Sequence, residues 1–340
     1  MSDRPYRPSG ARLPLRPGAV AAVGCAAACV LMVWHVPLTP APRDGGATRS
    51  RTWFGRTAAA PRADAAARLM RAGEDLICRA KQQAGVEPDT QSGADPTGMI
   101  GDEVTPLVTT LGSLEAKRTA ANPMWAAVLV RELAARDIGR GDVIAAGFSG
   151  SFPGLNLAVL SAARTLGVEV MAVSSVTAST WGANQPGFTW PEMEGRLVRS
   201  GLLPRASIAV TTGGDGDVAN DLEPDGRALA RRIRDASARA LGVAALAPRS
   251  PRDAVAQRMA SYRRGANGRR IVLYVNVGGT AASLGSSDAV LRLRSGFLPA
   301  RPFDRSEDRG VMARFAEQGV PVLTLLNIRD LALRWGIPLG

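Results

Sequence analysis

The sequence predicts an α/β protein with a doubly wound, mostly parallel sheet and glycine-rich loops between strands and helices, preceded by one N-terminal transmembrane helix. Three observations support this prediction. Short apolar runs alternate with stretches of helical period from about residue 105 onward, which is typical of parallel strands joined by crossover helices. Three of these runs end in loops rich in glycine and small polar residues. The apolar segment 18–36 is about long enough to cross a bilayer.

The N-terminal region is predicted to anchor the chain in the cell membrane as a single-pass protein. Segment 18–36 has no acidic or basic side chain apart from His35, and it follows a basic tail at residues 1–17. The segment is long for the apolar part of a signal peptide, and prolines follow it where a small-residue cleavage site would stand. We therefore expect an uncleaved signal anchor. A lipoprotein-type cleavage before Cys25 is the weaker alternative, because the apolar run continues past that cysteine.

Arginines on both flanks of the segment leave its orientation weakly specified. Those before it are Arg4, Arg7, Arg12 and Arg16, and those after it include Arg43, Arg49, Arg51 and Arg56. The rule that positive flanks stay in the cytoplasm therefore discriminates little. Because short basic tails usually stay inside, we expect the soluble domain on the extracytoplasmic side. Residues 37–62, rich in Pro, Ala and Arg, are expected to form a linker, and residues 63–340 the α/β domain.

Periodicity and end signals place the elements of this domain. Residues 63–84 carry apolar side chains on one helical face, and Gly85 ends the helix. Asn122 and Pro123 are expected to open a second helix over 122–138. A strand at 141–149, a helix at 154–167 and a strand at 168–176 form a βαβ unit. Further strands are predicted at 207–214, 270–279 and 320–327, and further helices near 223–241, 250–264 and 305–318.

Composition excludes several classes of function. His35 is the one histidine of the chain, so the soluble domain can supply neither a Ser-His-Asp or Cys-His catalytic group nor a histidine metal ligand. Cys25, Cys29 and Cys78 indicate no disulfide framework. The net charge of +12 comes from arginines spread along the chain, without the basic runs and interleaved aromatics of a nucleic-acid surface. We expect no nucleic-acid partner. Anionic lipid or an anionic polymer suits this charge better.

Three predicted strands end in comparable loops, "GFSGSFPGLN" (147–156), "TTGGDGDVAND" (211–221) and "VNVGGTAASLG" (275–285). In such sheets ligands bind beyond the carboxyl ends of the strands. Glycine lets the backbone approach a ligand, and exposed N–H groups together with hydroxyls favour an anion. The alternative is that tight turns alone require these glycines. The candidate ligand-binding residues are Ser149, Gly150, Ser151, Asn156, Thr212, Gly213, Gly214, Gly278, Gly279 and Thr280.

Lys117 is a further candidate ligand-binding residue. Two of the 42 basic side chains are lysines, so a lysine here can mark a position that needs a compact or titratable amine. Gly147, Ser149 and Ser151 resemble a nucleophile elbow, but a serine stands at the fifth position and no histidine is available. A Ser–Lys arrangement through Lys117 stays open. So does its alternative, an ordinary cation at the surface or paired with an anion.

Asp215 and Asp217 in "GGDGDVAND" are candidate ligands for a hard cation, and magnesium is the cofactor that they would suit. Turn chemistry explains aspartates beside glycines equally well. The stretch "SSVTASTWGANQPGFTWPEME" (174–194) contains two of the six tryptophans. It is expected to be either a lid or partner surface, or a long loop held in place by its aromatic side chains.

Several of these segments together resemble one known family. "GMIGDEVTPLVTTLGSLEAKRTAANP", "GDVIAAGFSGSFPGLNLAVLSAA", the 174–194 stretch, "YVNVGGTAASLG" and the terminal "LLNIRDLALRWGIP" are similar to the poly-gamma-glutamate system proteins, in order over about residues 97–338. Members of that family are membrane-anchored and are encoded beside the poly-gamma-glutamate synthase ligase and its membrane subunit. The family supplies no catalytic residues that could be transferred to this chain.

The resemblance implies a part in making, exporting or modifying a poly-gamma-glutamate capsule or secreted polymer. The expected function is that of a membrane-anchored accessory that binds the polymer or another anionic ligand at the glycine-rich loops. Its expected partners are the poly-gamma-glutamate synthase membrane complex, the anionic polymer or metabolite, and the membrane. The alternative is an enzyme of the same pathway that binds a phosphorylated nucleotide or metabolite with magnesium. No Walker-type motif is present, which weakens the case for ATP.

Overall fold

The computed structural model describes residues 60–340 except 88, 90–95, 287–289, 291 and 305–308. The predicted basic tail, the predicted transmembrane helix at 18–36 and nearly all of the predicted linker lie outside the described residues. Within the described part of the chain, no helix is both long and apolar enough to cross a membrane.

A seven-stranded sheet in the order β4-β3-β2-β1-β5-β7-β6 forms the centre of the described domain. Neighbouring strands run parallel except for β6, which pairs antiparallel with β7 at one edge. The strands are β1 (Val143–Phe148), β2 (Glu169–Ser175), β3 (Ser207–Thr211), β4 (Ala244–Ala245), β5 (Ile271–Val277), β6 (Gly296–Leu298) and β7 (Val322–Leu325). The prediction of an α/β protein with a mostly parallel sheet is confirmed.

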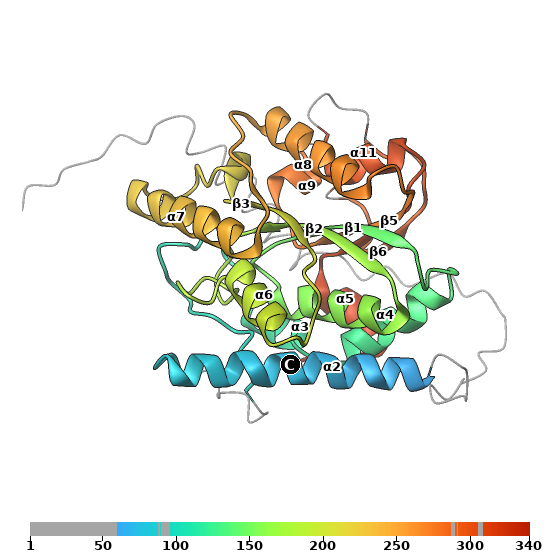
Figure 1. Cartoon of the computed structure of the whole chain (residues 1–340), viewed down its shortest axis with the longest axis horizontal. Helices are drawn as coiled ribbons and strands as arrows, with labels where there is room; N and C mark the ends of the chain where they lie inside the picture. Colours follow the sequence, from blue (N-terminus) through green and yellow to red (C-terminus); the bar gives the residue numbers. More distant parts are fainter. Residues whose placement is uncertain (1–59, 88, 90–95, 287–289, 291, 305–308) are drawn as a thin grey trace, which may run out of the picture. The chain divides into compact units, whose positions relative to one another are not determined.

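Helices cover both faces of this sheet (Figure 1). On one face α8 (Pro251–Ala266), α9 (Ala281–Leu284) and α11 (Val311–Glu317) pack around Tyr274. On the other face lie α3 (Leu114–Ala120), α4 (Met124–Ala134), α5 (Pro153–Leu166), α6 (Trp190–Arg199) and α12 (Ile328–Trp335). The helix α2 (Ala60–Gln83) packs outside α4, α5 and α6, and α7 (Pro224–Leu241) packs beside β3 and β4. A 3-10 turn, η1 (Asp215–Asp217), follows β3.

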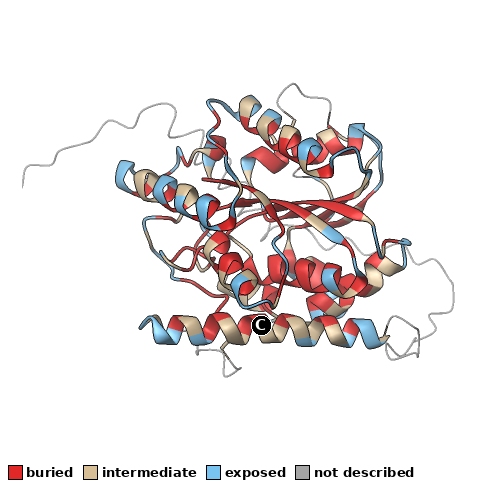
Figure 2. Cartoon of the chain, in the orientation of Figure 1, coloured by how far each residue is buried: buried red, intermediate tan, exposed pale blue. Residues whose placement is uncertain are grey.

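Burial on both faces explains why the central strands have continuous apolar runs. Every residue of β1 is buried, and Figure 2 shows the central strands coloured mostly as buried beneath the two helical layers. A strand with two covered faces needs apolar side chains at successive positions, not at alternate ones. The helix that follows, α5, has Pro153 in its first turn and ends at Gly167, whose φ of 74° lies in the left-handed region.

The structure also corrects several predicted bounds and adds elements. The helix expected at 122–138 is shorter, because α4 ends at Ala134 and Asp137 then adopts a φ of 57°. In the segment 305–318 the described helix begins only at Val311. The helices α3, α6, α9 and α12 and the short strands β4 and β6 were not predicted from the sequence. The two strands have only two and three residues, too few for a periodicity to be seen.

Candidate functional site

The strand order places a topological switch point between β1 and β5. From β1 the sheet grows outward through β2, β3 and β4, and the chain then returns to the opposite side of β1 to add β5. The helix after β1 packs on one face of the sheet, and α9 after β5 packs on the other. In open α/β sheets, ligands bind beyond the carboxyl ends of the strands at such a point. The predicted loops after β1 and β5 therefore flank the favoured place for a ligand.

These loops approach one another so closely that side chains would not fit at several glycines. A Cβ atom on Gly278 would lie 2.9 Å from the Cβ of Ser149, which joins the β5 and β1 loops. One on Gly150 would lie 2.7 Å from the carbonyl oxygen of Thr177, in the segment after β2. A Cβ on Gly213 would lie 2.6 Å from Thr177 Oγ1, so the loop after β3 also contacts the segment after β2. The three predicted loops, together with the segment after β2, thus form one contiguous edge, which we call the loop edge.

Several candidate ligand-binding residues hold the loop edge together. The buried Asn156 donates from Nδ2 to the carbonyl oxygen of Ser149 at 2.9 Å. Ser149 Oγ accepts a hydrogen bond from the backbone N–H of Ser151 at 3.0 Å. The side chain of Thr280 caps α9 by accepting from Ser283 N. Gly214 adopts a φ of 68°. These residues position the backbone. Gly279, by contrast, is exposed.

Buried polar atoms without a hydrogen-bond partner occur at the same edge. Among the described residues they include Thr212 Oγ1, Asn276 Oδ1, Asn156 Oδ1 and Arg258 Nη1. A buried donor or acceptor left unpaired costs about 1–3 kcal/mol, so such groups call for a ligand or a water molecule. Arg258 and Asn276 lie toward the α8 face. Arg258 belongs to α8, and Asn276 is two strand positions from Tyr274, which meets Tyr262 of α8 edge to face.

The carboxylate of Asp217 is paired with the guanidinium of Arg258. Arg258 Nε lies 2.7 Å from Asp217 Oδ2, and Nη2 lies 2.8 Å from Oδ1, with both side chains about 1% exposed. Nη2 also donates to Ser175 Oγ and Thr211 Oγ1. Burial disfavours the charged guanidinium, but the adjacent Asp217 outweighs this effect and raises the pKa of Arg258 above its ordinary value. The loop after β3 is therefore fastened to α8 by a buried ion pair.

This ion pair bears directly on the predicted magnesium ligands. Both oxygens of Asp217 already accept from Arg258, while Asp215 is exposed. No group of three or more His, Cys, Asp and Glu side chains suited to a metal ion occurs within the described part of the chain. The arrangement at η1 favours a structural role for Asp217, and magnesium binding there stays a prediction without support from this geometry.

Lys117 reaches the loop edge from the other face of the sheet, through α3. Its Nζ donates to the carbonyl oxygen of Ser151 at 2.5 Å and lies 2.7 Å from Ser179 Oγ. The same Nζ lies 3.9 Å from the centre of the Phe152 ring. Lys117 is 3% exposed, and no ion pair joins it to a carboxylate among the described residues. Burial lowers the pKa of Lys117 to about 7.

The alternative of an ordinary surface lysine is therefore excluded for Lys117. Lys81, the other lysine of the chain, is also buried, donates to the carbonyl oxygen of Ile100 at 2.8 Å and has its pKa lowered to about 8 by burial. All other basic residues of the chain are arginines, apart from His35. Both lysines are buried, where a compact amine can lose its proton and an arginine guanidinium would stay charged. At Lys117 that amine touches a serine hydroxyl.

The stretch 174–194 is a packed segment of the core and not a surface lid. Trp190 is fully buried and meets Phe148 edge to face. Thr189 and Glu192 form a capping box that opens α6. Glu194 is buried and accepts hydrogen bonds from the backbone N–H groups of Ala206 and Ser207 at the start of β3. Of the two alternatives, anchoring by aromatic side chains is the one that the structure bears out.

Sequence reasoning missed Ser179, Arg258 and Asn276. Ser179 lies within the 174–194 stretch, in the unremarkable run "VTAST". Arg258 is one of many arginines, and nothing in its helical pattern distinguishes it from an exposed one. Asn276 carried a usable signal, because an amide inside an otherwise apolar buried strand needs partners or a ligand.

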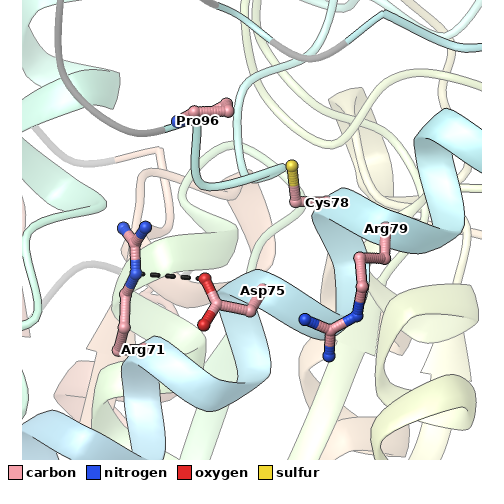
Figure 3. A pocket seen from close by; sticks show the side chains of 5 residues that line it. All are labelled: Arg71, Asp75, Cys78, Arg79 and Pro96. Carbon is pink, nitrogen blue, oxygen red and sulfur yellow. Dashed lines mark ion pairs between the residues drawn. The ribbon is translucent and has the colours of Figure 1, made fainter.

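The surface of α2 carries hollows whose lining residues do not belong to the loop edge. One of about 300 Å³ lies on α2 and is lined by Arg71, Asp75, Cys78, Arg79 and Pro96 (Figure 3). Arg71 Nε lies 3.0 Å from Asp75 Oδ1, one helical turn apart. Burial raises the pKa of the Cys78 thiol, which disfavours the reactive thiolate. This hollow is a salt-bridged helix surface beside an unreactive thiol, so it does not compete with the loop edge as a site.

The chain matches no protein-family model, no curated protein and no solved structure.

Proposed function

We propose that the chain is a membrane-anchored accessory protein of poly-gamma-glutamate biosynthesis or export, which binds the polymer or an anionic intermediate at the loop edge. The observation that carries the binding role is the set of buried, unpartnered polar atoms at the carboxyl ends of the strands. The sequence resemblance supports the assignment to this polymer, and the predicted segment 18–36 supports the anchor.

The chemistry of the unpartnered atoms fits a polymer that carries both carboxylates and amides. Arg258 Nη1 and the Thr212 hydroxyl are donors, which suit a carboxylate. Asn276 Oδ1 is an acceptor, which suits an amide N–H. A simple inorganic anion would satisfy the donors alone. A γ-glutamyl chain offers both kinds of group within each residue, so it suits the mixed set better.

The extent of the loop edge also favours a chain over a single small metabolite. The contributing loops follow β3, β2, β1 and β5, which are successive neighbours in the sheet. Strands in a sheet lie about 4.8 Å apart, so the loops after β3 and β5 are separated by about 14 Å. The glycine contacts join these loops along this length. No comparable observation supports the alternative hypothesis, an enzyme that binds a phosphorylated metabolite with magnesium.

Filling the loop edge at Gly279 should weaken binding without harming the fold. Gly279 is exposed, and a Cβ built on it would meet Leu284 and Leu326 at the ordinary contact distances of 3.5 and 3.7 Å. We expect Gly279→Leu to weaken the affinity for a short γ-glutamate oligomer by about tenfold or more, equivalent to about 1.4 kcal/mol. Isothermal titration calorimetry at about 0.15 M salt, where exposed charges are largely screened, measures this effect.

Gly139→Leu is the matched control. Gly139 lies in the turn before β1, at the opposite end of that strand, and a Cβ there would meet nothing within 4 Å. The two variants should share the melting temperature of the parent chain, and only Gly279→Leu should lose affinity. Equal affinities for both variants, or no binding of the oligomer by the parent chain, would contradict the proposal. A charge-matched polyacrylate separates recognition of the γ-glutamyl chain from attraction to the net positive charge.

A further inference from the structure

The environment of Ser179 is that of a serine activated by an amine. Lys117 Nζ lies 2.7 Å from Ser179 Oγ and has the carbonyl oxygen of Ser151 and the ring of Phe152 as its other neighbours. Among the residues that the structure describes, no carboxylate is paired with this amine. A neutral amine there donates one hydrogen to Ser151 O and offers its lone pair to the Ser179 hydroxyl. A buried lysine of this kind is a known type of general base.

Gly112 packs closely against the pair. A Cβ on Gly112 would lie 3.0 Å from Ser179 Oγ and 3.2 Å from Lys117 Cε, so a side chain at this position would crowd both groups. Gly112 is held by two hydrogen bonds with Thr180 Oγ1. Gly112 and Ser151 are both half-buried. The Ser151 hydroxyl accepts from the Ser179 N–H at 3.0 Å, which places a second hydroxyl at the same point.

We propose that Ser179 and Lys117 form a nucleophile and general-base pair that cleaves a carboxylic amide or ester. Lys117 Nζ takes the proton of the Ser179 hydroxyl while Oγ bonds to the carbonyl carbon. The bond from that carbon to the amide nitrogen or ester oxygen then breaks, and the leaving group takes the proton from the Lys117 ammonium. Water, deprotonated by Lys117, attacks the acyl-serine, releases the carboxylic acid and restores Ser179. Water is the one co-reactant.

The γ-glutamyl amide is the substrate that this pair takes, and that assignment rests on the proposed function. The pair and the loop edge are adjacent, because Ser151 belongs to both: it lies in the β1 loop and contacts Lys117 and Ser179. A polymer bound across the loops after β1 and β2 would carry its amides past Ser179. The chain would then trim the polymer that it binds.

A fluorophosphonate probe tests the pair directly, because such probes form a covalent bond with activated serines. Peptide mass spectrometry should find the probe on Ser179 of the full chain, and its rate of attachment should rise as the pH rises through about 7, where Lys117 loses its proton. Lys117→Met should slow attachment by about 100-fold or more, the usual contribution of a general base. Ser200→Ala, at the exposed end of α6, is the serine control and should leave the rate unchanged.

Ser179→Cys is a second test variant, and it replaces only the hydroxyl oxygen with sulfur. Its thiol should react with iodoacetamide faster at pH 7 than the thiol introduced by Ser149→Cys, because Lys117 takes up the thiol proton. Absence of probe on Ser179 in the folded parent chain, or equal rates with and without Lys117, would overturn the pair.

The substrate is tested separately by incubating the parent chain with the γ-glutamate oligomer and measuring oligomer length by mass spectrometry. Shortening that is lost in Ser179→Ala supports the γ-glutamyl assignment. An oligomer that binds in the calorimeter but keeps its length overturns that assignment and leaves the binding role intact. An oligomer that does not bind at all contradicts the proposed function itself, whatever the probe shows at Ser179.

Discussion

Replacing Asp217 with alanine should lower the free energy of unfolding by about 3–5 kcal/mol, the usual result of removing one partner from a buried ion pair. The variant leaves the guanidinium of Arg258 fully buried, with Ser175 and Thr211 as its hydrogen-bond partners and no carboxylate opposite it. Denaturant unfolding followed by circular dichroism measures the change. The double variant Asp217→Ala/Arg258→Met should recover much of the loss, because it removes the unpaired charge as well.

Asp215→Ala is the control for this experiment. Asp215 lies two residues away in the same 3-10 turn and is exposed, so its removal should change stability by no more than about 0.5 kcal/mol. If Asp215→Ala and Asp217→Ala lost the same amount, the loop after β3 would not be fastened by the buried pair. The structural role assigned to Asp217 would then be wrong, and its candidacy as a metal ligand would regain weight.

Lys117→Met should remove a rise in stability with pH that the parent chain shows between about pH 7 and pH 10. The pKa of Lys117 falls from 10.5 to about 7 because burial disfavours the charged amine. Between these values the unfolded chain binds a proton that the folded chain does not, so the free energy of unfolding increases with pH. The burial penalty is fully present below about pH 7 and is relieved as the pH rises toward 10. Its upper bound is about 5 kcal/mol, from about 1.4 kcal/mol per pKa unit.

The difference between parent and variant isolates this titration from the other groups of the chain. Lys81→Met serves as a comparison, because burial lowers the pKa of Lys81 only to about 8 and its window is correspondingly narrower. We expect the larger pH-dependent difference for Lys117. Parallel stability curves for the parent chain and Lys117→Met over this range would show that Lys117 keeps its proton in the folded protein, and it could not then act as a base near pH 7.

The sequence allowed the sheet to be predicted because its central strands are buried on both faces. Val143–Phe148 has only apolar residues and glycine, and Ile271–Val277 is apolar except for Asn276. Loops rich in glycine mark the ends of both strands. Helices such as α7 and α8 were equally visible, since Pro224 and Pro251 open them and Gly242 and Asn267 end them in left-handed conformations. These are local signals, which do not depend on what the element packs against.

Elements that depend on tertiary contacts could not be predicted in the same way. The helix α6 begins in a stretch of tryptophans and small polar residues, and its Glu194 faces the start of β3 instead of solvent. The local signals for it were the Thr189 and Glu192 capping box and Pro191 in the first turn. The helix α3 has only seven residues, which is too short for its periodicity to stand out.

The candidate site likewise has a part that local signals predict and a part that depends on tertiary contacts. Glycine, serine and threonine at strand ends pointed to the loop edge, because parallel strands bring their carboxyl ends to one side of the sheet. The pairing of Lys117 with Ser179 joins residues 62 positions apart, and that of Arg258 with Asp217 joins residues 41 positions apart. Contacts of this kind arise from the packing of α3 and α8 against the loops, and no spacing in the sequence encodes them.

The loop edge as the place where the polymer binds is tested most directly by amide hydrogen exchange with and without a γ-glutamate oligomer. We expect added protection in the segments 149–156, 176–184, 212–219 and 278–284, with the rest of the described domain unchanged. Added protection confined to other arginine-rich surface segments, or to the backbone around the hollow on α2, would contradict binding at the loop edge.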